Sequence, residues 1–447
     1  ELPPFSTPRT FFGEPLGLAY LSFAEAWERF SYYGMTALLV LYMTEALFLP
    51  GHIEHIAGVA SLRHALESVF GPMSTLALAS KVYGLYTGLV YFTPVFGGLI
   101  ADWWIGRKVA VAIAPVHMST GHIAMAFDAS FLLALVLLIT GCGLLKGNIS
   151  SQVGALYAED DGNGRTRGFS IFSVGINVRA VVGPLVCGLL AQQYGWHVGF
   201  GLAGILMLCG LATYLIGYHT LVEPPPSAVR AEAHAEPTSS RLRIIVTLVA
   251  IMALTIFHSI AYYQNSNIAL IWIDKHVDLN LLGFHVPVAW FNSIDPFISI
   301  IFVPILIVVW KWQDSRGGEP NEIIKISTGA FMACAANLLL FIGASLSDRV
   351  NVIYPIMYDV LLGVAFLYYW PTLLALVSRA APAGLKATLM GCVFLTLFVS
   401  NIIIGWIGGF YEHMTPAMFW AREAGIAGGG GGRALGLNKP HMRRLEP

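Results

Sequence analysis

The chain has 447 residues, of which 56% are hydrophobic and 11% charged, and its mean hydropathy is +0.68. This composition excludes an ordinary soluble globular protein and indicates an all-α polytopic protein of the lipid bilayer. The formal net charge is −1, and no basic stripe points to a nucleic-acid partner.

Apolar runs of about 20 residues, the length that crosses a bilayer, predict twelve transmembrane helices. The first is expected to direct membrane insertion itself, without a cleaved signal peptide. Residues 50–80 should form a partly helical external loop, and the last span is the least certain because five glycines interrupt it. The predicted spans are 16–44, 81–101, 108–127, 131–156, 168–191, 196–218, 243–272, 286–312, 323–345, 352–379, 385–410 and 414–436.

The segment 219–242 is polar and proline-rich, unlike the sequence on either side. Proline blocks helix continuation, and such a composition favours an extended linker. We therefore predict two six-helix bundles, 1–218 and 243–447, joined by a linker at 219–242. Lys and Arg gather in the loops on the linker's side, which predicts that the linker and both termini are cytoplasmic.

Three ionisable residues interrupt the first span. Even low estimates put the cost of each such group near mid-membrane at about 2.5–3.5 kcal/mol. Glu25 lies three residues before Glu28 and four before Arg29, so on a helix all three share one face. We expect this face to look into a polar cavity.

Lys146 lies inside the span 131–156, where an ammonium group needs a carboxylate or water. One interpretation is a static buried ion pair with Glu25 or Glu28. The alternative is a switchable pair in which protonation of a glutamate releases Lys146. We favour the switch, because a static buried pair adds little stability while a switch makes proton binding a conformational signal.

The sequence gives little support for a hydrolytic enzyme. The motifs His-Glu-x-x-His, Gly-x-Ser-x-Gly and Gly-x-Gly-Asp are absent from the sequence. The cysteines have no metal-type spacing and are expected to be small core residues. They are Cys142, Cys187, Cys209, Cys334 and Cys392.

Five motifs occur in order along the chain. Residues 25–34 read E-x-x-E-R-F-x-Y-Y-G, and further motifs occupy 91–108, 141–150, 172–177 and 293–296. Together they resemble the proton-coupled oligopeptide transporter family of the major facilitator superfamily. The resemblance implies that superfamily's fold and symport of di- and tripeptides with protons by alternating access. It also implies a monomer in a bacterial-type inner membrane, with the proton as coupling ion and no cofactor or metal.

The resemblance also implies roles for individual residues. A peptide carboxylate is expected at Arg29 and Lys146, and its amino end at Asp295 and Asn267. Proton coupling is expected at Glu25, Glu28, Arg29, Lys146 and Asp295. Further peptide contacts are implied for Tyr33, Tyr91 and Asn177, although Asn177 could instead join two helices by a hydrogen bond. Tyr32 is interpreted as a packing aromatic.

The chain departs from the family at three acidic or basic positions. Thr36 and Tyr262 stand where relatives carry an Arg and a Glu that pair as an outer gate, and Phe366 replaces a third, acidic residue. Because both gate residues are missing together, we infer a rebuilt gate. Lys146 must then rely on Glu25, Glu28 or a new acid, of which Asp295 is a stronger candidate than Asp359.

Arg179 stands where the family pattern places glycine. Our hypothesis is that it pairs with Glu25 or Glu28 and narrows the site. The alternative is that its side chain reaches the membrane interface. These departures keep two other functions open: transport of another small anionic or amphipathic solute, and a peptide sensor that does not transport.

Overall fold

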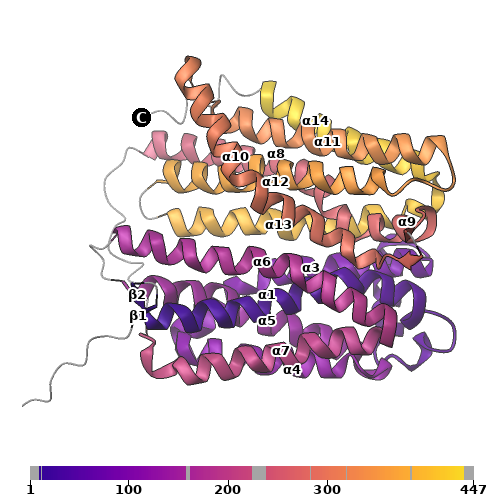
Figure 1. The fold of residues 1–447 in the computed structure, drawn as a ribbon, viewed down its shortest axis with the longest axis horizontal. Coiled ribbons are helices and arrows are strands. Elements are labelled where there is room, and N and C mark those ends of the chain that lie inside the picture. The colour runs from indigo at the N-terminus through magenta and orange to yellow at the C-terminus, as the bar shows by residue number, and fades with distance from the viewer. Residues whose placement is uncertain are drawn as a thin grey trace, which may run out of the picture. The chain divides into compact units, whose positions relative to one another are not determined.

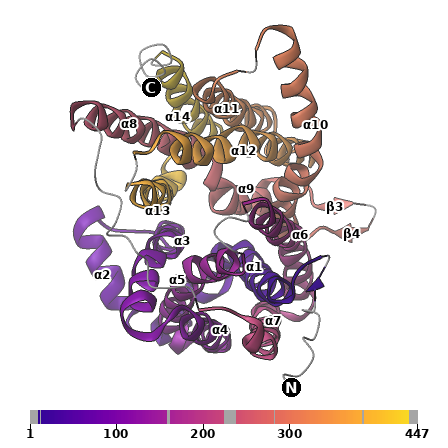
Figure 2. The same cartoon turned by 90° about the vertical axis from the view of Figure 1, so that its left-hand side faces the viewer.

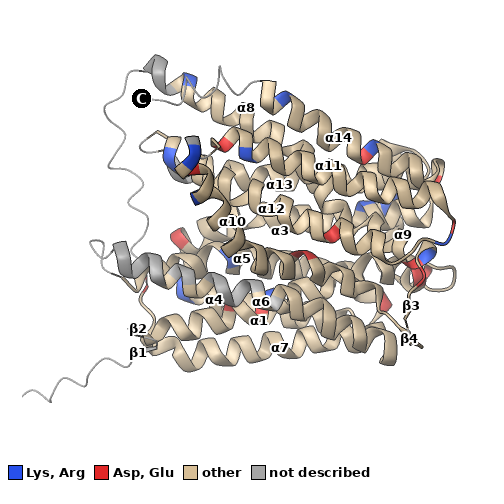
Figure 3. Cartoon of the chain, turned by 45° about the horizontal axis from the view of Figure 1, so that its top comes forward, with Lys and Arg blue, Asp and Glu red and all other residues tan. Residues whose placement is uncertain are grey.

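The computed structural model describes residues 10–11, 13–157, 162–223, 238–281, 283–318, 320–382 and 385–436. Long helices dominate this part of the chain (Figure 1). Charged residues lie mostly near the helix ends, with a few inside the helices (Figure 3). Eight of the helices in the described ranges are long and apolar enough to cross a membrane.

Each of the twelve predicted spans contains a long helix, including the twelfth. The first six are α1 (Leu16–Tyr42), α3 (Thr75–Ile100), α4 (Arg107–Ala124), α5 (Phe131–Ala155), α6 (Gly162–Tyr194) and α7 (Trp196–Gly217). The others are α8 (Thr238–Tyr263) with α9 (Ile268–His276), α10 (Ile294–Gly317), α11 (Glu322–Leu346), α12 (Ile353–Ala380), α13 (Lys386–Gly408) and α14 (Pro416–Gly436).

The segment 50–80 is partly helical, as predicted, because it contains α2 (Val59–Phe70). The predicted span 81–101 begins too late, since α3 already starts at Thr75. Two short antiparallel strand pairs are also present: β1 (Thr10–Phe11) with β2 (Glu14–Pro15), and β3 (Asn280–Leu281) with β4 (Phe284–His285). The second strand pair projects from the connection between α9 and α10 (Figure 2).

The seventh predicted span, 243–272, is not one continuous helix. A 3₁₀ turn, Gln264–Ser266, separates α8 from α9, and Asn267 has the unusual backbone angles φ −118° and ψ −100°. A 3₁₀ stretch within a helix often marks a hinge. The seventh span therefore offers a place where α9 can change direction relative to α8.

Contacts divide the chain into two compact units. The first holds residues 1–35 and 93–228, and the second holds 36–92 and 229–447. Residues 36–92, from the N-terminal half of the sequence, thus group with the C-terminal half. The six-and-six division drawn from the sequence remains a prediction about which parts move together.

Close helix contacts in each unit depend on glycine. In the first unit a Cβ on Gly97 of α3 would lie 2.1 Å from the carbonyl oxygen of Gly143 on α5, so neither helix can carry a larger residue there. In the second unit a Cβ on Gly430 of α14 would lie 2.4 Å from the Cβ of Phe257 on α8. The glycine run in α14 therefore has a packing role that the sequence did not reveal.

The prediction that all five cysteines are core residues is wrong. Cys142 and Cys187 are buried, Cys334 and Cys392 are partly buried, and Cys209 is exposed. Cys209 lies on α7, and a membrane helix can present a small apolar side chain outward as readily as inward. The side chains of Asn177 and Arg179, and residues 224–237 of the linker, lie outside the described residues.

Candidate functional site

The charged residues of α1 do lie together. The Nε atom of Arg29 is 2.8 Å from Oε1 of Glu25 and 2.6 Å from Oε2 of Glu28. All three side chains are buried, and Glu28 is 0% exposed. The sequence spacing therefore predicted a real cluster, in which one guanidinium faces two carboxylates.

Lys146 on α5 lies on the same side of the unit as this cluster. Its Nζ atom is 4.9 Å from the centre of the Tyr32 ring, and Cζ of Arg29 is 5.8 Å from the same ring. Lys146 also attracts Glu25 electrostatically. The Tyr32 ring therefore makes cation–π contacts with both Arg29 and Lys146. The interpretation of Tyr32 as a packing aromatic is incomplete.

A thiol also joins the cluster, which sequence reasoning missed. Sγ of Cys142 on α5 donates a hydrogen bond of 3.3 Å to Oε1 of Glu28. Cys142 precedes Lys146 by four residues, so the two side chains share one face of α5. That spacing was the available signal in the sequence, because the residue four positions before a lysine inside a span lies on the same helix face and meets the same partners.

Asp295 of α10 has a partner from α8 in the second unit. The hydroxyl of Tyr262 donates a hydrogen bond to Oδ2 of Asp295. Phe366 of α12 stacks on Tyr262, with ring centres 5.6 Å apart and planes inclined by 27°. Tyr262 and Phe366, at the two positions where the sequence lacks the expected acids, therefore contact each other. Tyr262 also bonds Asp295, the acid that we expected to compensate for them.

Asn267 and Tyr91 also lie in the second unit. Asn267 is 0% exposed, and its Nδ2 atom donates to Oγ of Ser80 at 2.8 Å and to Oε1 of Gln264 at 3.2 Å. Tyr91 of α3 lies 6.4 Å from Tyr263, measured between ring centres. Asn267 thus joins α3 to the break in the seventh span, and its contact with a peptide remains a prediction.

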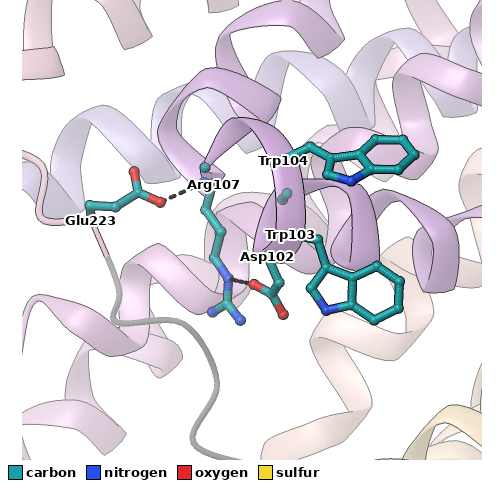
Figure 4. Close-up of a pocket in the computed structure, with 7 residues that line it drawn as sticks. Asp102, Trp103, Trp104, Arg107 and Glu223 are labelled. Atoms are coloured by element: carbon teal, nitrogen blue, oxygen red, sulfur yellow. Dashed lines mark hydrogen bonds and ion pairs between the residues drawn. The ribbon is translucent and has the colours of Figure 1, made fainter.

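A shallow pocket lies at the start of α4 in the first unit (Figure 4). Nε of Arg107 is 2.8 Å from Oδ1 of Asp102, so these two residues form an ion pair at the start of α4. The carboxylate of Glu223 accepts backbone N–H bonds from Arg107, at 2.5 Å, and Lys108, at 3.0 Å. An acid at the positive end of a helix is favourable, so Glu223 fixes the start of the linker to α4.

Comparisons with known proteins agree with these observations. Residues 108–236 and 224–421 match the sequence profile of the POT family. The chain is 28% identical over 469 residues to the uncharacterized transporter YclF of Bacillus subtilis, covering 92% of this chain and 91% of that one. It is 26% identical over 489 residues to the peptide transporter YePEPT of Yersinia enterocolitica, covering 92% and 91%.

A solved structure is similar over nearly the full length. The crystal structure of the peptide transporter POT in complex with sulfate has a TM-score of 0.85 and 25% identity, covering 98% of both chains. Long apolar helices with charged groups held inside them, in the major facilitator arrangement, define an integral membrane transporter. The chain belongs to the POT family.

Proposed function

We propose that the protein is a proton-driven symporter that imports di- and tripeptides by alternating access. The observation that carries this proposal is the double ion pair of Arg29 with Glu25 and Glu28. A guanidinium that faces two carboxylates offers one positive charge to two negative ones. Protonation of either glutamate removes that excess of negative charge and leaves Arg29 available to a peptide carboxylate.

Lys146 completes the positive side of this site. Its ammonium group, held over the Tyr32 ring and attracted by Glu25, is a second contact for the peptide carboxylate. Asp295 is the proposed partner of the peptide's amino group and a second proton acceptor, with Tyr33, Tyr91, Asn177 and Asn267 as further contacts. The rocking of two bundles about this site would expose it to each side of the membrane in turn.

The setting of the transporter completes the proposal. We place it in the inner membrane of a bacterial-type cell, as a monomer with both termini cytoplasmic. Its partners are small peptides and protons, and the coupling needs no cofactor. Peptide transport is the activity named for its relative YePEPT and for the di-/tripeptide transporter of Lactococcus lactis, which is 26% identical over 487 residues.

The test is uptake of a labelled dipeptide into proteoliposomes, with and without an inward proton gradient. The variants Glu25→Gln and Glu28→Gln should lose gradient-driven uptake while still exchanging peptide across the membrane, because each lacks a titratable proton but keeps the side chain's shape. Competition by tripeptides supports a peptide substrate, whereas competition by nitrate alone supports another anion. Undiminished gradient-driven uptake in both variants would refute the assignment of proton coupling.

A further inference from the structure

An acid that the proposed mechanism does not use lies buried in α14. Glu423 is 0% exposed, and neither of its carboxylate oxygens has a hydrogen-bond partner among the described residues. The neighbouring Arg422 attracts Glu423 electrostatically, but it is exposed and directs its guanidinium at the Phe410 ring, with Cζ 5.4 Å from the ring centre. A buried carboxylate without a paired cation is costly, so the geometry favours the protonated form.

Other buried polar groups near Glu423 increase the free-energy cost of placing a negative charge there. Tyr358 and Asp359 of α12 are both buried, and the Tyr358 hydroxyl and Oδ2 of Asp359 have no hydrogen-bond partner among the described residues. Tyr358 interacts electrostatically with Asp359, Glu423 and Asp295. Three carboxyl groups therefore share one buried region of the second unit.

The helices packed against α14 supply little to offset this charge. α11 runs beside α14 (Figure 1), and its Cys334 contacts Gly428, which places residues 335–341 opposite Glu423. That stretch contains no titratable side chain. On α8 the titratable ring of His258 is engaged elsewhere, because it stacks on Tyr262 and lies 4.2 Å from the Tyr369 ring, measured between ring centres. A proton is therefore the simplest means of neutralising Glu423.

Gln264 connects Glu423 to the break between α8 and α9. The Gln264 side chain interacts with Glu423, and its Nε2 atom donates to the carbonyl oxygen of Ile404 on α13 at 3.4 Å. Its Oε1 atom accepts from Asn267, which in turn donates to Ser80 of α3. A change of charge on Glu423 would thus alter the hydrogen bonds of Gln264 and Asn267, which lie at the break between α8 and α9.

We propose that Glu423 is a further proton-binding carboxyl of this transporter, besides Glu25, Glu28 and Asp295, and that it acts through Gln264 on the break between α8 and α9. The inference rests on the proposed function as a proton-coupled transporter. The carboxyl takes a proton from water and returns it to water. When it loses the proton it becomes a stronger acceptor for the second N–H of Gln264 Nε2, which competes with the bond to Ile404 and loosens the link to α3.

The experiment compares Glu423→Gln with the parent protein in proteoliposomes. The amide has the shape of the protonated acid, so we expect Glu423→Gln to fold, to bind dipeptide and to exchange it. We expect the pH of half-maximal gradient-driven uptake to move by about one unit, a tenfold change in proton concentration. Glu423→Asp keeps a titratable group and should restore the parent's pH profile in part. The matched control is Glu54→Gln, which alters an exposed external acid and should change nothing.

Infrared difference spectra provide a readout that does not depend on transport. The C=O stretch of a protonated carboxyl should be present in the parent protein and reduced in Glu423→Gln. An unchanged infrared band together with an unchanged pH profile would overturn the proposal and leave Glu423 a structural residue. Failure of the proposed function would look different, because the parent protein itself would then show no gradient-dependent uptake.

Discussion

At the scale of single residues, aromatic rings act as partners of charged groups as well as packing material. Tyr32 lies under the cations of Arg29 and Lys146, and Tyr262 bonds Asp295 while it stacks on Phe366. A cation over a ring is stabilised by about 0.5–2 kcal/mol, with the larger values where water is excluded. The tyrosines therefore help to determine where the proposed substrate-binding charges lie.

The first prediction concerns Tyr32. Tyr32→Leu removes the ring under Lys146 and Arg29 and should weaken dipeptide binding about fivefold, which corresponds to about 1 kcal/mol. Tyr32→Phe keeps the ring and should bind nearly as well as the parent. Isothermal titration in detergent measures both affinities. Equal loss in the two variants would mean that the hydroxyl, and not the ring, matters.

At the scale of helices, α14 packs closely against α8 through a glycine. From the sequence pattern alone, such a glycine would be read as a helix breaker. A Cβ on Gly430 would meet Phe257, whereas a Cβ on the adjacent Gly429 would meet nothing within 4 Å. A membrane-embedded helix tolerates such a run because its backbone groups must bond to each other. The same five glycines therefore include some that are required for packing and some that are not.

A matched pair of variants tests this difference. Gly430→Ala should lower the thermal unfolding temperature in detergent, because overpacking costs typically about 1–3 kcal/mol. Gly429→Ala should leave it unchanged or raise it, since alanine is a better helix former by up to about 1 kcal/mol. If both variants unfold at the same temperature, α14 does not depend on its contact with α8.

The segment that directly follows α1 carries a pH-sensitive contact. Glu45 lies in the turn Met43–Leu47 that follows α1, and its partner Asp274 lies on α9. Partial loss of water around the carboxyl, the charge of Asp274 and a hydrogen bond to Asp274 raise the pKa of Glu45 to about 7, and Lys275 opposes them only in part. A raised carboxyl pKa stabilises the fold at low pH, and that contribution is lost as the pH rises through 7.

The protein should therefore have a lower unfolding temperature at pH 8 than at pH 6. Glu45→Gln keeps a hydrogen-bond donor for Asp274 at every pH, so its unfolding temperature should fall less over the same interval. Scanning fluorimetry in detergent measures both profiles. The same decrease in parent and variant would show that Glu45 does not cause it.

At the scale of the whole molecule, each of the two compact units combines stretches that are far apart in the sequence. Residues 36–92 group with 229–447, and within that unit α3 meets α13 through close backbone approaches. A Cβ on Gly405 of α13 would lie 2.8 Å from the carbonyl oxygen of Ser80, and one on Gly409 would lie 3.4 Å from the Cβ of Ala77. A transporter that alternates its access must separate such a contact during each cycle.

Cross-linking tests whether this contact opens. Ala77→Cys with Gly409→Cys places two Cβ atoms about as close as a disulfide requires, roughly 3.5 Å. Oxidation should stop dipeptide uptake, and dithiothreitol should restore it. Ala77→Cys alone, treated in the same way, controls for the native cysteines. Full uptake by a protein that is demonstrably cross-linked would mean that α3 and α13 stay together throughout the cycle.

The sequence by itself determined the class of protein, the twelve spans and the charged cluster of α1. These follow from properties that act locally: the bilayer demands apolar runs of fixed length, and helical periodicity places Glu25, Glu28 and Arg29 on one face. Only the tertiary structure decided which residues meet across helices. The bond of Cys142 to Glu28, the pairing of Tyr262 with Asp295 and the burial of Glu423 depend on how separate helices pack. Helix packing is set by contacts that no local sequence pattern records.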